Sequence, residues 1–188
     1  MILHIFTEEA SFKEFAVRFL NRLMPDICCR IYPHQGKQDL EKALRSTLPT
    51  ISRMPEARVL IVRDQDSDNC RLLKKKLDDM VSDYCHSTYK IRIVCRELEC
   101  WFLGDMEAIA GAYPRFKPEL HRHKADYRIV DEIADAPDRL LRMVPELKRN
   151  KTLPKMDFAN RVASHMTVEA NSSTSFRHFI SAIHQLTK

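Results

Sequence analysis

The sequence contains few glycines, with only three among its 188 residues. Nucleotide-binding motifs such as GxGxxG and the Walker loop need several glycines, because the backbone must approach the phosphate groups closely. Neither motif occurs in the chain. A nucleotide cradle built from backbone N–H groups is therefore not expected. A phosphotransferase or phosphatase acting on a small phosphorylated substrate is less favoured for the same reason.

Long hydrophobic runs and cysteine motifs are also missing. No stretch approaches the roughly 18 apolar residues that a membrane-spanning helix needs, and the N-terminal segment has no basic stretch followed by an apolar run. We therefore expect a cytoplasmic protein without a membrane partner. The six cysteines form no CxxC pair, which argues against a zinc site or a disulfide framework and predicts reduced, mostly buried thiols.

The composition is that of a compact globular protein, with 44% hydrophobic and 30% charged residues. Disordered and fibrous chains have different compositions, and the length argues against two full enzymatic domains. The net charge of +5 is unevenly distributed. Residues 1–137 hold 22 acidic and 22 basic side chains, whereas residues 138–188 hold four acidic and nine basic ones. The positive surplus therefore lies entirely in the C-terminal segment.

Short β-like runs alternate with longer helical patterns, which is typical of an α/β fold. We predict a mostly parallel four-stranded sheet flanked by helices over residues 1–113, and a basic, mostly helical extension over residues 114–188 that packs on it as one unit. The expected strands are Ile2–Phe6, Ile27–Tyr32, Val59–Arg63 and Ile91–Cys95. The expected helices are Phe12–Leu23, Gln38–Leu48, Cys70–Tyr84, Glu97–Ala110 and Ser175–Leu186.

Several helix starts carry capping signals. Ser11 and Glu14 have the spacing of a capping box, and Asp68 and Asn69 precede the helix expected from residue 70. A serine hydroxyl of the segment 171–175 is expected to cap the last helix.

Carboxylates follow three of the four expected strands. They are Glu8 and Glu9 after the first strand, Asp64, Asp66 and Asp68 after the third, and Glu97 and Glu99 after the fourth. The carboxyl ends of parallel strands lie at one edge of a sheet, so these side chains are expected to lie near one another. Clustered carboxylates repel, and a cation such as Mg²⁺ or Mn²⁺ offsets that repulsion. The sequence therefore predicts a metal site at this edge.

Two alternatives remain for individual acids. Asp68 is equally suited to a helix-capping role. Glu97 and Glu99 are two residues apart, which is about 200° around a helix, so only one of them is expected to face the metal. An EF-hand is excluded, because Asn69 stands where the loop needs glycine and Lys75 where it needs glutamate.

These motifs resemble the Toprim domain of topoisomerases, primases and OLD-type nucleases, in which a lone glutamate and a DxD motif organise Mg²⁺ for phosphodiester chemistry. More closely, the whole chain resembles a bacterial Toprim-related family known as a domain of unknown function, often encoded beside an ATPase in defence loci. The segments that carry the resemblance are Ile5–Ser11, Gly36–Leu40, Val62–Cys70, Arg96–Asp105 and Asn171–Arg177.

The resemblance implies a Toprim-like fold and roles for particular residues. Asp64, Asp66 and Asp68 are the expected metal ligands, and Glu99 resembles the additional acidic ligand of the nuclease-type members. Glu8, favoured over Glu9, is expected either to hold a second ion or to act as general base. The two cations expected to neutralise charge on the phosphoryl group are Lys37 and Arg96.

The basic C-terminal residues are candidates for nucleic-acid binding, since Lys and Arg side chains neutralise backbone phosphates. Ordinary surface charge is the alternative interpretation. The candidates are Lys148, Arg149, Lys151, Lys155, Arg161 and Arg177.

The sequence thus predicts a Mg²⁺- or Mn²⁺-dependent nuclease that cleaves DNA or RNA. By resemblance, it would act in bacterial defence against phage with an ATPase partner, and a homodimer is a candidate assembly. The alternative hypothesis is a non-catalytic module that binds nucleic acid, or regulates a partner, on the same scaffold.

Overall fold

The computed structural model describes residues 1–188. Four short 3₁₀ helices lie between Pro118 and Leu147, in addition to the strands and α-helices. In chain order the strands and α-helices are β1 (Ile2–Thr7), α1 (Ala10–Leu23), β2 (Cys28–Pro33), α2 (Lys37–Ser46), α3 (Leu48–Ile51), β3 (Ala57–Asp64), α4 (Cys70–Val81), β4 (Thr88–Val94), α5 (Glu99–Leu103), α6 (Met106–Ala112), α7 (Ala136–Met143), α8 (Lys155–Ala163) and α9 (Thr174–Thr187).

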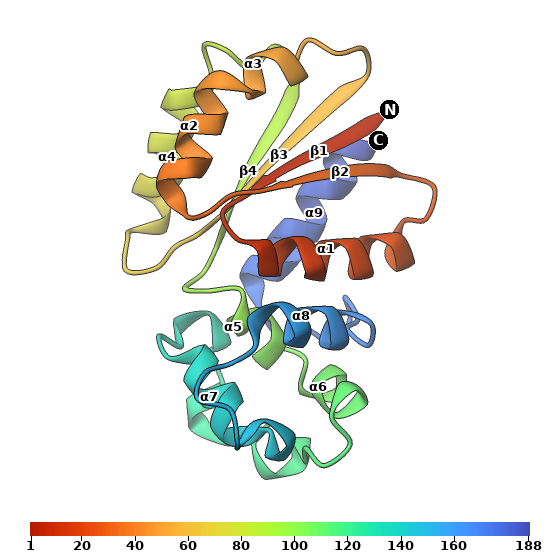
Figure 1. Ribbon diagram of the computed structural model, residues 1–188, viewed down its shortest axis with the longest axis vertical. Helices are drawn as coiled ribbons and strands as arrows, with labels where there is room; N and C mark the ends of the chain where they lie inside the picture. The colour runs from red at the N-terminus through yellow and green to blue at the C-terminus, as the bar shows by residue number, and fades with distance from the viewer.

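The four strands form one sheet in the order β2-β1-β3-β4, and every neighbouring pair is parallel (Figure 1). This confirms the expected α/β fold. Parallel neighbours require a crossover connection, and helices supply it between successive strands of the chain. The carboxyl ends of the strands point toward a lobe of short helices, seen below the sheet in Figure 1.

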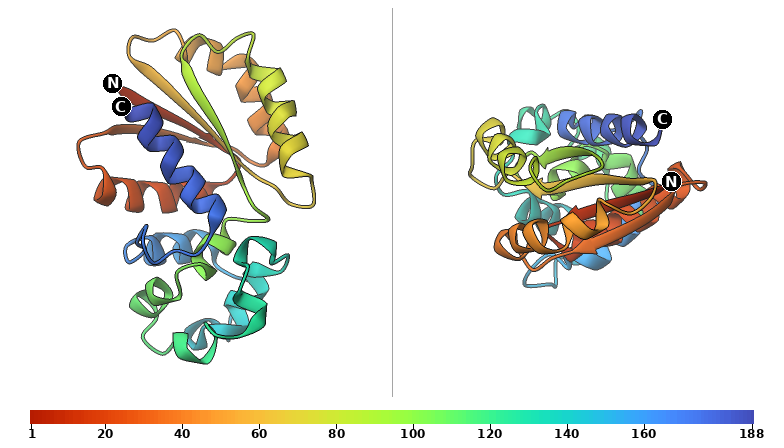
Figure 2. Two further views of the ribbon diagram at one scale, coloured as in Figure 1. Left: turned by 180° about the vertical axis from the view of Figure 1, so that it is seen from behind. Right: turned by 90° about the horizontal axis from the view of Figure 1, so that it is seen from above.

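Side chains alternate along each strand, so the sheet buries two separate hydrophobic faces. On β3, Leu60 and Val62 belong to the larger core, together with α1 and α9, whereas Val59 and Ile61 belong to the smaller core, with α2, α3 and α4. Figure 2 shows α9 crossing one face of the sheet. The larger core has 38 buried residues and continues into the helical lobe, so the sheet and the lobe share one hydrophobic core.

An aromatic cluster joins the N-terminal, middle and C-terminal parts of the chain. Trp101 in α5 lies 6.0 Å from Phe12 and 5.6 Å from Phe15 of α1, and 5.0 Å from Phe179 of α9, measured between ring centroids. Its indole Nε1 donates a hydrogen bond to Ser175 Oγ at 2.7 Å. The one polar group of the buried indole ring therefore has a hydrogen-bond partner, as buried tryptophan side chains usually do.

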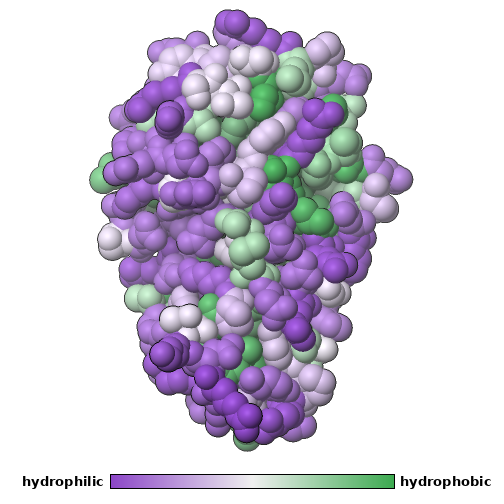
Figure 3. All heavy atoms as spheres, viewed as in Figure 1, coloured by the Kyte–Doolittle hydropathy of each residue, from purple (hydrophilic) through white to green (hydrophobic).

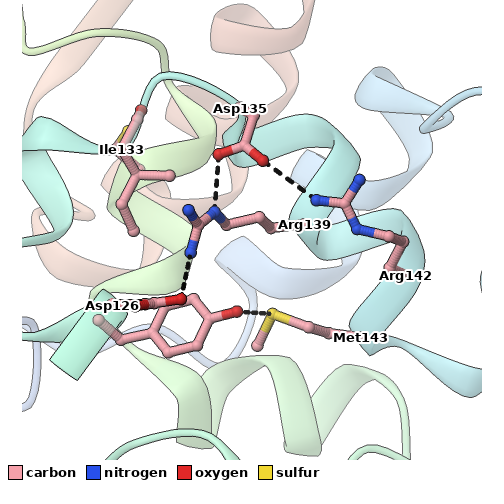
Figure 4. Close-up of polar contacts among 8 residues, drawn as sticks. Asp126, Ile133, Asp135, Arg139, Arg142 and Met143 are labelled. Carbon is pink, nitrogen blue, oxygen red and sulfur yellow. Dashed lines mark hydrogen bonds and ion pairs between the residues drawn. The ribbon is translucent and has the colours of Figure 1, made fainter. Parts of the chain in front are cut away.

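The helical lobe is made of α5 to α8 and the 3₁₀ helices, while α9 returns to the sheet (Figure 1). The lobe thus includes α5 and α6, which precede residue 113 in the sequence. Ion pairs connect its segments, as Figure 4 shows. Arg139 contacts Asp135 at 2.7 Å and Asp126 at 3.4 Å, and Arg142 contacts Asp135 at 3.0 Å.

The expected strands and the last helix are confirmed, apart from one to three residues at their ends. Ser173 Oγ accepts a hydrogen bond from Phe176 N, which confirms a serine cap on α9. The capping box at Ser11 is wrong, because α1 begins at Ala10, two residues before the expected Phe12, and the Ser11 hydroxyl donates to Glu9 instead. Glu9 occupies the N-cap position without a side-chain capping bond.

The helix expected over 97–110 is divided into α5 and α6. Gly104 follows α5, and a Cβ at this position would lie 2.4 Å from Asn171 Oδ1. Asp105 then caps α6 by accepting a hydrogen bond from Ala108 N. Close approach of the 171–175 segment therefore requires glycine at the break.

All six cysteines are free thiols. Only Cys100 is buried and Cys28 is exposed, so the expectation of mostly buried thiols was wrong. The surface seen in Figure 3 is mainly hydrophilic, with hydrophobic residues in small separate patches. None of the helices has the length and hydrophobicity needed to span a bilayer.

Candidate functional site

The acidic residues lie where the strands end beside the helical lobe. β1 leads into Glu8 and Glu9, β3 ends at Asp64, and the loop after β4 carries Glu97, two residues before α5 begins at Glu99. The sheet order places β3 between β1 and β4. The three strand ends are therefore neighbours, but the acids that follow them divide between two charged groups, around Lys155 and around Arg63.

The loops after β3 and β4 are joined by backbone hydrogen bonds. Gln65 N donates to Val94 O at 2.8 Å, and Asp66 N donates to Arg96 O at 3.0 Å. Asp66 and Arg96 both have left-handed backbones, with φ of 53° and 59°. Such conformations are uncommon outside glycine and often mark functional sites. The hydrogen bonds between the two loops stabilise these two unfavourable backbone conformations.

Lys155 is the cation of the acidic cluster on the α1 side of the sheet. Its Nζ lies 3.2 Å from Glu97 Oε2, 3.5 Å from Glu99 Oε1 and 3.8 Å from Glu9 Oε2. It is the first residue of α8 and therefore reaches the strand ends from the helical lobe. The three carboxylates are thus held around one ammonium group, which we call the Lys155 cluster.

Two carboxylates of this region are buried. Glu99 is 1% exposed and Asp64 is 8% exposed. Burial raises the pKa of Asp64 well above its ordinary value, and the charges of Glu9 and Glu99 raise it further. Burial likewise raises the pKa of Glu99 to about 7, although the Lys155 ammonium opposes this shift. Neither carboxylate oxygen of Glu99 accepts a hydrogen bond.

The side chains of Glu97 and Glu99 do not diverge as they would on a helix. Both carboxylates contact the same Lys155 ammonium. Glu97 lies before α5, and Glu99 is the first residue of that helix. The 100° rotation per residue of a helix therefore does not apply between the two side chains.

A second charged group lies on the opposite face of the sheet, around Arg63. Its side chain is 3% exposed and contacts Glu41 at 2.7 Å, Glu8 at 3.8 Å and Asp68 at 4.0 Å. Sequence reasoning missed Arg63 and Glu41 as site residues. The sequence did contain a sign of this group, since Arg63 directly follows the apolar run Val59–Val62 of β3. An arginine buried in a strand needs carboxylate partners.

Glu8 is the most deeply buried acid of this Arg63 group. Burial raises its pKa, and the neighbouring Asp66 charge raises it further, while Arg63 and Lys37 oppose the shift. Its Oε2 accepts no hydrogen bond. Lys37 is exposed at the start of α2, close enough to affect Glu8 by its charge.

The remaining predicted ligands differ in position. Asp66 and Asp68 are exposed, whereas Asp64 is buried. Asp68 does not cap α4, because Asn69 Oδ1 accepts the hydrogen bonds from Arg71 N and Leu72 N. Arg96 is half-buried in the loop after β4.

The six basic candidates do not form a uniform surface. Lys155 lies in the acidic cluster, Arg161 pairs with Asp157 at 2.8 Å on α8, and Arg177 donates to the Asn171 carbonyl. The exposed side chains without a recorded polar contact are Lys148, Arg149 and Lys151.

The acidic side chains of this region are the ligand type that a hard divalent cation such as Mg²⁺ prefers, but they do not form a metal centre in this structure. No group of three or more His, Cys, Asp or Glu side chains lies close enough to hold an ion. The oxygens of Glu99 nevertheless lack hydrogen-bond donors, and all nearby candidate ligands are carboxylates, which Mg²⁺ and Mn²⁺ prefer. Asp64 and Glu99 are therefore the residues best suited to hold such an ion.

A protein-family comparison identifies the chain. The family described as "Domain of unknown function (DUF4276)" matches residues 7–184, so the chain belongs to this family. No curated protein and no solved structure matches it. Family membership assigns no activity, and the Toprim relationship stays a proposal.

Proposed function

We propose that this protein is a divalent-cation-dependent nuclease that hydrolyses phosphodiester bonds in DNA or RNA. The observation that carries the proposal is the buried pair Asp64 and Glu99. Both have raised pKa values, and Glu99 has two buried oxygens without hydrogen-bond donors. Burial disfavours the ionised form of both carboxylates, and Lys155 offsets this only in part for Glu99, so a bound Mg²⁺ or Mn²⁺ would lower the remaining electrostatic cost.

Asp64 and Glu99 would hold the ion, with Asp66 and Asp68 at the rim. A bound ion would polarise the scissile phosphate and lower the pKa of a coordinated water. A Toprim-like organisation is consistent with this assignment, since Glu8 follows β1 and the aspartates follow β3 of a parallel sheet.

Glu8 is the proposed general base. The raised pKa of Glu8 favours accepting a proton from an attacking water. Arg63 forms an ion pair with the same carboxylate at 3.8 Å and positions it. Lys37 and Arg96 are the proposed cations for the charge that develops on the phosphoryl oxygens. The substrate would be bound in the cytoplasm with help from Lys148, Arg149 and Lys151.

A specific observation favours a second candidate, the non-catalytic binding or regulatory module. The Lys155 ammonium already neutralises part of the acidic cluster, as it would in a structural ion-pair network. By family resemblance, either form would work with an ATPase encoded beside it in a bacterial defence system, and a second copy of the chain is a further proposed partner.

The test is a cleavage assay on plasmid, single-stranded DNA and tRNA in Mg²⁺ or Mn²⁺, with and without the neighbouring ATPase. We expect cleavage by the native chain, at least 100-fold loss in Asp64→Asn and Glu99→Gln, and unchanged cleavage in Asp126→Asn, whose carboxylate lies in the helical lobe. Cleavage that persists in both site variants would contradict the proposed centre. Absence of cleavage in every form, with nucleic-acid binding retained in Asp64→Ala plus Asp66→Ala, would establish the non-catalytic alternative.

A further inference from the structure

A basic groove runs along the outer edge of the sheet, between α4 and α9. Two adjoining cavities of about 620 and 470 Å³ line strand β4, and they share Arg71, Lys74, Ile91 and Arg92. Figure 2 shows β4 lying between the two helices in its left view. We call this surface the β4 groove; its cations are Arg71, Lys74, Lys75, Lys90 and Arg92.

These cations are not neutralised by acids. None of the five forms an ion pair. Two carboxylates also line the groove, and both accept hydrogen bonds from other groups of its lining. Asp78 accepts a hydrogen bond from Tyr89 OH at 2.7 Å, and Asp131 accepts bonds from the backbone N–H groups of Thr174 and Ser175. Five cations against two carboxylates leave the groove with a net positive charge.

The stability of α4 does not explain this charge. Arg71 and Lys74 lie in the first turns of the helix, whereas Asp78 and Asp79 lie near its end. A helix is stabilised by acids near its N-terminus and by bases near its C-terminus, so this order opposes the helix dipole. The cations are thus placed at a cost to the helix that carries them.

Protection of the sheet edge explains only part of the surface. Charged residues on an edge strand hinder pairing with another chain, and Lys90 and Arg92 serve that purpose on β4. The cations of α4 do not belong to the edge strand. A ligand with repeated negative charges accounts for both sets.

The groove is elongated and leads toward the acidic centre. It extends from Tyr89 to Cys95, a length of roughly 20 Å at the rise of a β-strand. Cys95 directly precedes Arg96 and lies two residues before Glu97. Cations spread over this length match successive phosphates of a nucleic-acid strand, which are about 3.4 Å apart along a duplex, better than a single small phosphate.

We propose that the β4 groove binds the phosphate backbone of a nucleic-acid strand and leads it to the strand ends. This names the binding path for the substrate of the proposed nuclease, and in that sense rests on the proposed function. Binding itself requires neither a metal ion nor cleavage, so the two proposals can fail separately.

The test measures fluorescence anisotropy of labelled 20-nucleotide single-stranded DNA, single-stranded RNA and duplex DNA, in EDTA and at several salt concentrations. The groove variant is Arg71→Glu with Lys74→Glu. The matched control is Lys42→Glu with Arg45→Glu, which reverses the same two residue types at the same spacing on the exposed side of α2. Circular dichroism verifies that both variants are folded.

We expect the groove variant to bind at least one of the three nucleic acids about 10-fold or more weakly than the native chain. The slope of log affinity against log salt concentration should fall by the amount that corresponds to about two phosphate contacts. The control should stay within about twofold of the native chain. Equal losses in both variants, or no loss in either, would overturn the inference. Loss of binding in the groove variant, with no cleavage by the native chain, would support the groove and contradict only the nuclease.

Discussion

Lys155 connects the two parts of the molecule through charge. It comes from the helical lobe and contacts carboxylates that follow β1 and β4. Burial alone lowers the pKa of an ammonium, but the charges of Glu99 and Glu9 outweigh this and raise the pKa of Lys155 above its ordinary value. Lys155 is therefore charged at neutral pH, where its ammonium faces the buried Glu99 carboxyl.

Glu99→Gln should stabilise the metal-free protein at high pH. The folded-state pKa of about 7 lies above the ordinary 4.5, so the protonated carboxyl favours the folded state below pH 4.5, and this contribution is lost as the pH rises through 7. The difference corresponds to about 3 kcal/mol. Urea unfolding in EDTA at pH 5 and pH 8 should show a smaller fall in stability for Glu99→Gln than for the native chain.

The matched control is Glu119→Gln, because Glu119 is exposed in the helical lobe. It should leave the pH dependence of unfolding unchanged. A fall in stability of the same size in Glu99→Gln and in the native chain would show that the Glu99 carboxyl does not titrate in this range.

Lys155→Gln should destabilise the protein more at pH 8 than at pH 5. Its removal leaves the buried Glu99 carboxylate without its cation, and the partial exposure of Lys155 limits the cost to about 1–2 kcal/mol. At pH 5, Glu99 is protonated and the loss of stability is smaller.

Urea unfolding of Lys155→Gln, Glu99→Gln and the double variant measures the interaction energy between these two side chains, which should be larger at pH 8 than at pH 5. Arg161→Gln, which removes a solvent-exposed ion pair of the same helix, should leave the stability nearly unchanged at both pH values.

At the scale of single elements, the strands were the part that sequence patterns predicted best. Short apolar runs flanked by turn residues identified all four strands to within about three residues. Helix starts were less predictable. The hydroxyl and carboxyl groups of Ser11 and Glu14 have the spacing of a capping box, but Ser11 bonds to Glu9 and Glu14 accepts from Asn160, a residue distant in sequence.

The start of α9 depends on a carboxylate from the helical lobe. Asp131 Oδ2 accepts hydrogen bonds from Thr174 N at 2.8 Å and Ser175 N at 3.0 Å. These are two of the N–H groups that a helix leaves unpaired at its N-terminus, and a negative charge there is favourable.

Asp131→Ala should therefore destabilise the protein by about 1–2 kcal/mol, the usual effect of losing an N-terminal cap. Chemical unfolding measures this, and hydrogen exchange should locate faster exchange at the start of α9. Asp126→Ala removes an exposed carboxylate of the same lobe and should cost less than about 0.5 kcal/mol. Equal effects of the two substitutions would rule out the proposed cap.

For the whole molecule, the central question is whether sheet and lobe behave as one unit. The larger core contains residues of α1, α9 and the lobe, with Trp101 at their junction. The elements after residue 113 therefore complete the core of the elements before it. Two independently stable parts would require two separate cores.

Equilibrium unfolding should accordingly follow a single cooperative transition. The fluorescence of Trp101, the one tryptophan of the chain, reports on the junction, and far-ultraviolet circular dichroism reports on all helices and strands. We expect both signals to change at the same urea concentration. Two transitions at different concentrations would show that the sheet and the lobe unfold separately.

The sequence by itself determined the α/β class, the strands and the presence of acids at three strand ends, because these depend on local periodicity and on residues that directly follow each strand. Only the tertiary structure decided how the charges are grouped. Lys155 meets Glu99 from 56 positions away, and Arg63 pairs with Glu41 across the crossover that joins two strands. The β4 groove likewise exists because β4 lies at the sheet edge, beside the cations of α4. Such contacts follow from strand order and packing, which local patterns do not specify.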